Sequence, residues 1–467
     1  MVRKYKKKWY LRTAFSQISI INYKMSKNIV LKRGLDIPIS GSAGLYVSKS
    51  MVPAVVAVCP DGVRGLLPRL LVKEGDRVLC GSPVIADKKN PDIILTAPAS
   101  GTVKEVVRGE KRKLLAILIQ TDPEQEYAGI DTADVKSALL SSGLWTLLTQ
   151  RPYGVLADPS VTPKGIFVSA FNSAPLAADY EFTLGKEVNA IQKGIDALAT
   201  LAPVHVSLDA SVKDSAFAGL TGCTIHRFQG KHPAGNVGVQ ISHISPIMKG
   251  ETVWTLTLNG LAAIGRLFLT GKVNVRRKVA VGGPAAIQPS YVDTLPGTPV
   301  KEFAPFYGNS SADEVRIISG DVLSGRCVGM NGYLGRDDDQ VTIIREGTDK
   351  ELLGWIRPFR FNQFSTDHSY FSWLLPRKRY DMDTNLHGGP RPFLMNDNYY
   401  SKVLPMDIYP VYLAKACLAG DIEKMEKFGI YEVLPEDLAT CEFVDPSKNY
   451  IQDYIAKGID LMLKEMA

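Results

Sequence analysis

Three histidines and a glycine-containing turn are the first residues of this chain whose types suggest metal or nucleotide chemistry. His226, His232 and His243 are separated by six and eleven residues, intervals that bring no two of them together on adjacent turns of one helix, as two ligands of a zinc site would be. The segment HPAGNVG supplies only Gly235 and Gly238, whereas a dinucleotide-binding loop needs three glycines directly after a strand. We therefore expect histidines that form hydrogen bonds in turns or in the core, and a tight turn rather than a phosphate-binding loop.

The cysteines also lack the spacing of a reactive or metal-binding group. They stand singly, with no CxxC pair, at Cys59, Cys80, Cys223, Cys327, Cys417 and Cys441. This pattern indicates neither a zinc module, nor an iron-sulfur cluster, nor a disulfide framework, and it favours a reducing compartment. Cys441, in DLATCEFVDPSKNY, is expected to be a small buried apolar side chain rather than a nucleophile. The chain also lacks Walker A and HExxH sequences, so no self-contained catalytic site is predicted.

Composition and charge place the chain among ordinary globular proteins. Its 467 residues, 45% hydrophobic and 22% charged, are sufficient for roughly three domains. The net charge of +7 comes from residues 1–24, which hold seven basic residues and no acidic one, and the rest of the chain holds 48 of each. Nucleic acid is therefore not an expected partner. We expect residues 1–24 to be a disordered extension or the product of a start codon assigned too early, with Met25 as the alternative start. No apolar run reaches the length of a membrane-spanning helix.

The first elements along the chain are short strands. From Ile29 to Thr121, β-branched runs alternate with Gly, Pro and Asp, which predicts a small all-β unit. Within it, VKEGDRVLCGSPVIADKKNP and TAPASGTVKEV resemble the two related halves of a biotinyl/lipoyl barrel-sandwich hybrid. In carriers of that family a hairpin lysine bears the cofactor, which would here be Lys88 or Lys89. The interval from these lysines to Gly101 is longer than in carriers, so neither biotin nor lipoate is expected.

The middle of the chain follows the pattern of a parallel α/β sheet. Residues 165–171 and 203–209 are predicted strands, and apolar residues at helical spacing predict an amphipathic helix over 187–201. A second round follows, with ETVWTLTL as strand, LAAIGRLFLTGK as helix with a glycine stop, and RKVAVGGP as strand. The preceding segment ALLSSGLWTLLTQRPYG is predicted to be helical and to run into a loop broken by proline. Residues 285–350 predict a small antiparallel β or α+β insert, and the last hundred residues include two helical stretches.

Eleven motifs in a fixed order carry a resemblance to one family. They are KRGLDIPISG, VKEGDRV, DKKNPDIILTAPASGTVKEVVRGEKR, SGLWTLLTQRPYG, NSAPLAAD, HPAGNVG, AIGRLFLTG, RIISGDVLSG, YLGR, ELLGWIRP and VLPMDIYP. From Asn28 to Ala467 the chain resembles the A-subunit family of the Na⁺-translocating NADH:quinone oxidoreductase. The resemblance implies a translocase subunit, peripheral on the cytoplasmic side of the bacterial inner membrane, in a six-subunit complex that passes electrons from NADH to quinone and exports Na⁺. Its partners would be the other five subunits, especially the B subunit, which is embedded in the membrane, and the C subunit. No complete catalytic site is expected in this chain alone.

The same resemblance implies that a flavin site has been lost. The family is distantly similar to the FMN- and NADH-binding subunit of respiratory complex I, in which a G-x-G-G-A-G-F-P loop surrounds the flavin. The corresponding segment here, SGLWTLLTQRPYG, carries side chains where the backbone would have to approach the flavin closely, so no FMN is expected.

The family is associated with quinone, and a quinone ring needs an apolar slot, an aromatic face and a hydrogen-bond donor. The candidate quinone-binding residues are Trp145, Leu148, Arg151, Pro152 and Tyr153. An alternative stays open, in which Trp145 is ordinary core and Arg151 is a surface ion-pair partner. The second function that stays open is a purely structural docking subunit of the complex, with the quinone site elsewhere.

We expect five segments from these patterns. They are a basic extension (1–24), a barrel-sandwich-hybrid-like domain (25–125), a Rossmann-like α/β domain related to the complex I flavin subunit (126–284), a small β-grasp-like, soluble-ligand-binding domain (285–355) and a mixed, then helical C-terminal region (356–467). The fold class is thus multidomain α/β plus β.

Overall fold

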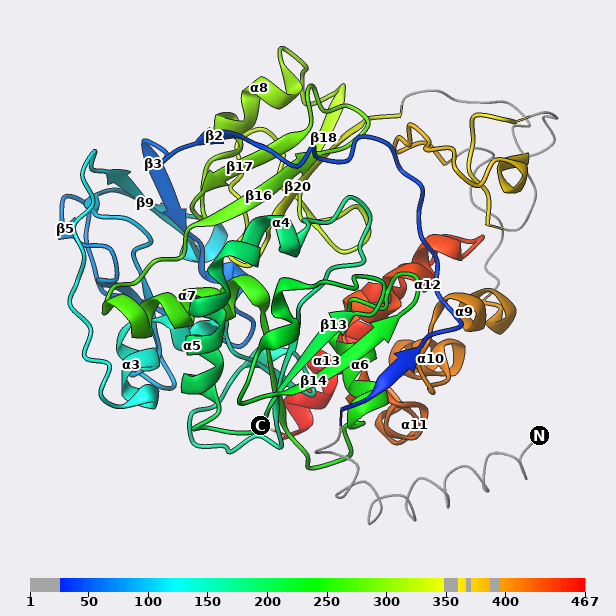
Figure 1. The fold of residues 1–467 in the computed structure, drawn as a ribbon, viewed down its shortest axis with the longest axis horizontal. Coiled ribbons are helices and arrows are strands. Elements are labelled where there is room, and N and C mark those ends of the chain that lie inside the picture. Colours follow the sequence, from blue (N-terminus) through cyan, green and yellow to red (C-terminus); the bar gives the residue numbers. More distant parts are fainter. Residues whose placement is uncertain (1–25, 348–359, 367–370, 387–394, 467) are drawn as a thin grey trace.

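The computed structural model describes residues 26–347, 360–366, 371–386 and 395–466. The expected extension (1–24) and parts of the C-terminal region lie outside these residues. The described chain forms a small β barrel, a parallel α/β unit, a second mixed sheet and a group of C-terminal helices, arranged as Figure 1 shows.

The barrel consists of two small antiparallel sheets packed around one core. Its strands are β3 (Val55–Val58), β4 (Pro68–Leu70), β5 (Arg77–Val78), β6 (Pro83–Asp87), β7 (Ile94–Thr96), β8 (Gly101–Arg108) and β9 (Leu114–Thr121). One sheet has the order β3-β9-β8-β5 and the other β4-β6-β7. Lys88 and Lys89 are exposed in the turn between β6 and β7. The all-β prediction for this part of the chain is confirmed.

The α/β unit is built on a seven-stranded sheet with the order β1-β14-β13-β12-β15-β10-β11. Five strands are parallel: β1 (Asn28–Val30), β14 (Thr224–Gln229), β13 (Val204–Asp209), β12 (Ile166–Ser169) and β15 (Val253–Thr257). The antiparallel pair β10 (Thr149–Arg151) and β11 (Val155–Leu156) completes one edge. The strands predicted at 165–171, 203–209 and ETVWTLTL are therefore confirmed in a parallel sheet.

Both faces of this sheet are covered, because successive side chains on its strands alternate between two cores. On β12, Ile166 and Val168 pack into one core and Phe167 into the other. The first core lies under α5 (Val188–Leu198) and α7 (Leu258–Thr270), and α7 ends at Gly271, whose φ is +68°. Both predicted helices and the glycine stop are confirmed. The second core lies under α6 (Val237–Ile244) and the C-terminal helices.

The second sheet has the order β19-β18-β20-β16-β17-β2. Its strands are β2 (Val47–Ser50), β16 (Arg277–Gly282), β17 (Ser290–Thr294), β18 (Val315–Ser319), β19 (Arg326–Cys327) and β20 (Gln340–Arg345), and α8 (Ala304–Tyr307) lies beside it. The pairs β16–β20 and β17–β2 are parallel. The expectation of a small antiparallel β or α+β insert at 285–350 is corrected in its extent and pairing, because RKVAVGGP and a strand near residue 47 also belong to this sheet and pair partly in parallel.

Two expected domain boundaries fail for the same reason. Residues 25–125 do not all belong to the barrel, since β1 lies in the seven-stranded sheet and β2 in the six-stranded one. The range 126–284 likewise includes β16, which pairs in the other sheet.

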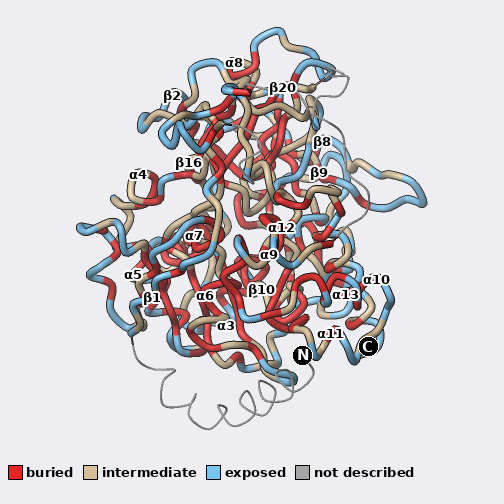
Figure 2. Tube along the Cα trace, turned by 90° about the vertical axis from the view of Figure 1, so that its right-hand side faces the viewer, coloured by how far each residue is buried: buried red, intermediate tan, exposed pale blue. Residues whose placement is uncertain are grey.

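The C-terminal region is helical as predicted, but it is not a separate layer. Its helices are α9 (Asp397–Val403), α10 (Pro410–Ala419), α11 (Ile422–Phe428), α12 (Ala439–Val444) and α13 (Ile451–Met466). Leu413, Ile451 and Ile455 pack in the same core as Phe167 of β12, so these helices cover the second face of the parallel sheet. Figure 2 shows buried residues concentrated where the sheets and these helices meet, with exposed residues in the connections.

The segment ALLSSGLWTLLTQRPYG differs from its prediction. It forms α3 (Val135–Ser141), a 3-10 turn η3 (Leu144–Leu147) and then β10, rather than one helix followed by a loop. Gly143 separates the two helical turns at φ +75°, a conformation that side-chain-bearing residues rarely adopt.

Candidate functional site

Trp145 and Leu148 lie inside the core of the α/β unit. Trp145 is 1% exposed, its indole Nε1 donates a hydrogen bond to the Ala157 carbonyl oxygen at 2.8 Å, and its ring meets the edge of Trp254 at 5.3 Å between centroids. Leu148 is fully buried in the same core. These contacts fit the interpretation of Trp145 as core.

Arg151 faces the C-terminal region and is held by two carboxylates. Its Nη1 lies 2.9 Å from Asp437 Oδ2 and its Nη2 lies 3.0 Å from Glu436 Oε1. Burial lowers the pKa of Arg151, but the charges of Asp437 and Glu436 outweigh burial and raise it. Arg151 is 2% exposed, so it forms a buried ion pair and not the surface pair of the alternative interpretation.

Pro152 and Tyr153 continue toward the same C-terminal helices. The Arg151–Pro152 peptide bond is cis, and both Pro152 and Tyr153 are buried. The Tyr153 ring meets the edge of Tyr431 at 6.1 Å. The five residues expected around one quinone are thus divided between the two faces of the sheet, and the structure does not bring their side chains together. The expectation is corrected in that respect.

A cavity of about 210 Å³ lies on the other side of the same segment, where the barrel, the α/β unit and the six-stranded sheet meet. Its apolar walls come from all three units, and they include Val58, Leu95, Leu144, Leu147, Val273, Val275 and Leu334. None of the five predicted residues lines it, but Gly143, Leu144, Thr146 and Leu147 from their segment do. Arg326 is exposed and also lines the cavity, so the cavity opens to solvent beside this residue.

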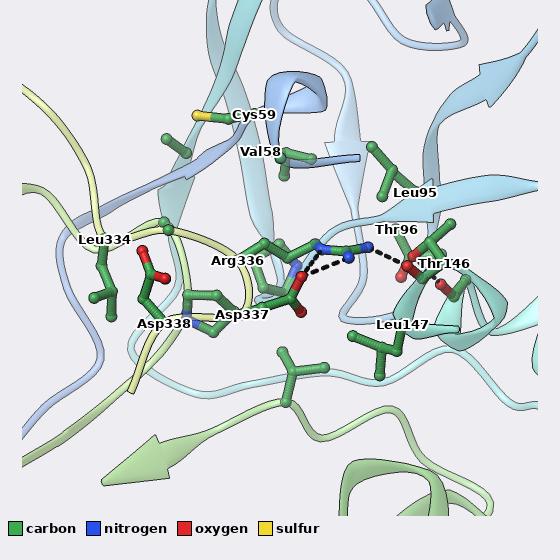
Figure 3. Close-up of a pocket in the computed structure, with 18 of the residues that line it drawn as sticks. Val58, Cys59, Leu95, Thr96, Thr146, Leu147, Leu334, Arg336, Asp337 and Asp338 are labelled. Atoms are coloured by element: carbon green, nitrogen blue, oxygen red, sulfur yellow. Dashed lines mark hydrogen bonds and ion pairs between the residues drawn. The ribbon is translucent and has the colours of Figure 1, made fainter. Parts of the chain in front are cut away.

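Three arginines line this cavity, namely Arg277, Arg326 and Arg336. Arg336 Nη1 donates to the Thr146 carbonyl oxygen at 2.6 Å, and Arg336 also pairs with Asp337 at 2.7 Å, as Figure 3 shows. These bonds tie the six-stranded sheet to the turn η3. Arg336 is therefore fully engaged within the chain.

Arg277, at the start of β16, has fewer hydrogen-bond partners than Arg336. It is 6% exposed, its Nη1 makes a long hydrogen bond of 3.4 Å to the Asp338 carbonyl oxygen, and no described residue accepts a hydrogen bond from its Nε. Burial lowers its pKa, and the nearby carboxylates of residues 337–339 oppose that effect. A buried donor without an acceptor is costly, so Arg277 is suited to bind an oxygen atom of a ligand.

The histidines and the HPAGNVG turn act as their sequence pattern predicted. His226 Nε2 and His205 Nδ1 are 3.0 Å apart, His232 Nδ1 lies 3.1 Å from Ser173 Oγ, and His243 Nε2 lies 2.7 Å from the Pro405 carbonyl oxygen. The HPAGNVG segment is a turn that leads into α6. A Cβ on Gly238 would lie 2.2 Å from Asp437 Oδ2, so this glycine leaves room for the Arg151–Asp437 pair.

Three further features concern metal ions, the membrane and the buried thiol. Within the described residues, no cluster of three or more His, Cys, Asp or Glu side chains is arranged to hold a metal ion. No helix among them is both long and apolar enough to cross a membrane. Cys441 is fully buried, and burial raises its pKa, which confirms its prediction as a small core side chain.

Comparison with known proteins gives consistent matches along the chain. Family models match at residues 29–122 (NqrA N-terminal barrel-sandwich hybrid domain), 130–273 (NqrA second alpha/beta domain) and 278–329 (NQRA C-terminal domain). The A subunit of the Na(+)-translocating NADH-quinone reductase of Serratia proteamaculans (strain 568) is 38% identical over 437 residues, which cover 90% of this chain and 96% of that protein. The chain belongs to this A-subunit family. The A subunit of the same enzyme from Yersinia pestis bv. Antiqua (strain Angola) is 36% identical over 433 residues, covering 90% of this chain and 96% of the relative. That of Vibrio anguillarum is 35% identical over 448 residues, covering 94% and 100%.

In this A-subunit chain, the sequence patterns identified the segment that borders the cavity but missed the polar residues opposite it. Arg277 is the first residue of the strand RKVAVGG, and the alternation of apolar and polar residues in this strand does not predict that Arg277 is buried. Arg336 stands in YLGRDDD, and the three aspartates after it are the one signal of a charged cluster.

Proposed function

We propose that this chain acts as the A subunit of a Na⁺-translocating NADH:quinone reductase. In this role it is a peripheral subunit on the cytoplasmic side of the bacterial inner membrane, in contact with the other five subunits and especially the B and C subunits. The complex couples electron transfer from NADH to quinone with Na⁺ export. Relatives with that name, which match nearly their whole length, support the proposal. Within this role we infer a Rossmann-like α/β domain and a β-grasp-like six-stranded sheet.

We further propose that the chain binds the quinone ring in the cavity between the three units. The observation that carries this proposal is the buried Arg277 Nε in a largely apolar cavity. A quinone ring is planar and neutral, so it gains from apolar walls such as Leu144 and Leu147, and its carbonyl oxygen can accept the Arg277 hydrogen bond. An apolar cavity of about 150 Å³ holds a benzene ring, so the volume here is sufficient for a substituted ring.

The five residues first predicted for quinone take an indirect part in this proposal. Trp145 and Leu148 each directly follow a cavity-lining residue, Leu144 and Leu147, in the turn η3 and at its C-terminal end. Trp145 fixes the turn through its bond to Ala157, and Arg151, Pro152 and Tyr153 fix the strand that follows it to the C-terminal region. They hold the wall of the cavity in place.

Photoreactive quinone labelling followed by peptide mapping tests the proposal directly. The assembled complex is irradiated with an azido-quinone, with and without excess unmodified quinone. We expect protectable label in peptides that contain residues 143–147, 273–277 or 334–338. Protectable label confined to other subunits would instead support the alternative function, a structural docking subunit with the quinone site elsewhere.

A cavity-filling substitution gives a second test with a matched control. Cys59 lines the cavity, whereas Cys327 is exposed and does not line it. Cys59→Phe should weaken quinone binding at least tenfold, while Cys327→Phe should leave it unchanged. Reduction of an artificial acceptor by NADH should persist in both variants, because hydride transfer belongs to another subunit in this proposal. Equal quinone affinity in both folded variants would contradict the cavity assignment.

We also propose that the chain carries no FMN, iron-sulfur cluster, biotin or lipoate. The isolated cysteines, the side chains in SGLWTLLTQRPYG and the interval from Lys88 or Lys89 to Gly101 support this proposal. A visible absorbance band that copurifies stoichiometrically would contradict it. An intact mass above the polypeptide value by a lipoyl or biotinyl increment would also contradict it.

A further inference from the structure

Residues 361–366 and 371–380, which we call the loop, stand apart from the sheets, at the upper right of Figure 1. Lys378 Nζ closes it by donating to the Phe361 carbonyl oxygen at 2.9 Å and to Asn362 Oδ1 at 2.7 Å. Tyr380 joins it to the body, because its backbone nitrogen donates to the Pro38 carbonyl oxygen at 2.8 Å. Tyr380 is 2% exposed, so the end of the loop is fixed firmly.

This loop exposes large apolar side chains. Trp373, Leu374 and Leu375 are 52%, 52% and 40% exposed, and Phe361 is 47% exposed with its ring stacked on Phe371 at 5.4 Å. Scattered single apolar residues are normal on a surface, but here three consecutive large apolar residues are exposed. We call residues 373–375 the apolar tip.

Basic residues follow the apolar tip directly. Arg377 and Arg379 are exposed, and residues 371–379 contain no acidic residue. The chain from residue 25 onward has equal numbers of basic and acidic residues, so three consecutive basic residues are a local excess along the chain. The next acidic residue, Asp381, accepts a hydrogen bond from Ser40.

We propose that this loop binds the surface of an anionic lipid bilayer. Trp373 and the two leucines enter the boundary between headgroups and acyl chains, where an indole ring is favourable. Arg377 and Arg379 remain at the level of the headgroups and pair with lipid phosphates. Charge complementarity favours an anionic bilayer, and the exposed side chains of the apolar tip can enter a fluid phase without a pre-shaped partner. This proposal adds a direct lipid contact to the proposed peripheral role and does not depend on the quinone site.

Vesicle flotation with the full chain tests it. Vesicles with equal parts phosphatidylglycerol and phosphatidylcholine should bind the protein, and vesicles of phosphatidylcholine alone should bind it much less. Arg377→Gln/Arg379→Gln should weaken binding to the anionic vesicles about 25-fold, at about fivefold per basic residue. The matched control Lys136→Gln/Lys213→Gln removes the same charge from exposed sites outside the loop and should have little effect.

The apolar contribution has its own pair of variants. Trp373→Ser/Leu374→Ser should weaken vesicle binding at least tenfold. Leu269→Ser/Leu418→Ser changes leucines that are 53% and 50% exposed on α7 and α10, and it should not weaken binding. Melting temperatures of all variants should match that of the original chain, because every changed side chain is exposed.

Insertion is read out by brominated lipids, which quench nearby tryptophans. Trp373→Phe keeps an apolar ring, so it should retain vesicle binding and lose most of the quenching. Anionic vesicles that fail to bind the full chain, or that bind both loop variants as well as the original, would overturn the proposal. Normal vesicle binding combined with loss of complex assembly in the loop variants would also overturn it and assign the tip to a protein partner.

Discussion

Two buried arginines at the centre of the molecule have opposite surroundings. Both Nη atoms of Arg151 pair with carboxylates, those of Asp437 and Glu436, whereas Arg277 has one long hydrogen bond to a backbone carbonyl oxygen. The Nε of each arginine lacks an acceptor among the described residues, but only Arg277 lines the cavity. Removing one partner of a buried ion pair is costly because the other charge is left buried and unpaired. A buried donor with few acceptors can instead gain a hydrogen bond from an oxygen atom of a ligand. The two residues therefore lead to different predictions.

Arg151→Ala should lower the free energy of unfolding by about 3–5 kcal/mol, because it leaves Asp437 buried without its partner. Lys113→Ala removes an exposed ion pair with Asp61 and should cost less than about 1 kcal/mol. Urea unfolding of both variants measures the difference. Equal costs would show that the Arg151 pair is no more important than a surface pair.

Arg277→Met should weaken quinone binding by one to two decades, because a hydrogen bond from a charged donor is worth roughly 1.5–3 kcal/mol. Its neighbour provides the control, since Arg276 pairs with Asp293 outside the cavity. Quinone titration of Arg276→Met should match the original protein. Unchanged affinity in a folded Arg277→Met variant would contradict the role of this residue in the proposed site.

The buried histidine pair predicts a loss of stability in acid. Burial lowers the pKa of His205 to about 3 and that of His226 to about 4, whereas histidine in an unfolded chain titrates near 6.5. The unfolded state therefore binds more protons once the pH falls below about 6.5, so stability decreases from there downward. The decrease should be on the order of 2–4 kcal/mol at about pH 5. In His205→Gln/His226→Gln the profile should be flatter, as measured by denaturant titrations across pH, and an equally steep profile would exclude the pair as the cause.

At the scale of elements, sequence patterns predicted the parts whose side chains alternate in a regular way. The strand around Ile166 and the helix over 187–201 followed from apolar periodicity, which reflects burial on one or two faces. The structure of the segment ALLSSGLWTLLTQRPYG was not predicted correctly, because the local pattern of its apolar residues is typical of a helix. Its last residues instead pair antiparallel with β15, which is a tertiary contact without a local signal.

The close crossing of α5 and α7 depends on small residues, and helix propensity alone would wrongly predict that replacing such a glycine by alanine is stabilising. A Cβ on Gly265 of α7 would lie 1.6 Å from the Ala190 carbonyl oxygen of α5. Alanine is favoured over glycine inside a helix by about 1 kcal/mol, but here the two backbones would have to move apart.

Gly265→Ala should therefore lower the free energy of unfolding by about 2 kcal/mol or more, despite the gain in helix propensity. Gly129→Ala is the control, since a Cβ there meets no atom within 4 Å. Thermal unfolding of both variants tests the prediction. A Gly265→Ala variant as stable as the original would show that the helices can separate at little cost.

At the scale of the whole molecule, the domain boundaries were the least predictable feature. The resemblance identified the barrel, and the alternation of strand and helix patterns identified the α/β unit. Neither showed which sheet each strand would join. β1 and β2 precede the barrel in sequence and pair with β14 and β17, which come after it. The cavity could not be predicted either, because it exists only where three units meet and its key donor, Arg277, belongs to the sheet placed in the wrong domain.

Two truncations separate the basic extension from the first strand. A chain that starts at Met25 should keep its melting temperature and assemble normally, in line with the expectation for residues 1–24. A chain that starts at Lys32 loses β1 and Leu31, which is 8% exposed in the core and whose nitrogen donates to the Gln229 carbonyl oxygen at 2.8 Å. Its melting temperature should fall by several degrees, at about 2–4 °C per kcal/mol for a large domain. Loss of assembly with the shorter deletion would show that the basic residues bind a partner or lipid.

The pairing of β1 with β14 also has a consequence for the order of events during synthesis. The barrel strands are contiguous from Val55 to Thr121, so the barrel can fold soon after its last strand leaves the ribosome. The first strand must wait for a partner about 199 residues later, which is roughly 10–40 s at ordinary bacterial rates of translation. During that interval its apolar residues are exposed on a nascent chain. Ribosome-bound chaperones should therefore contact the N-terminus of this chain well after the barrel that follows it has become protease-resistant.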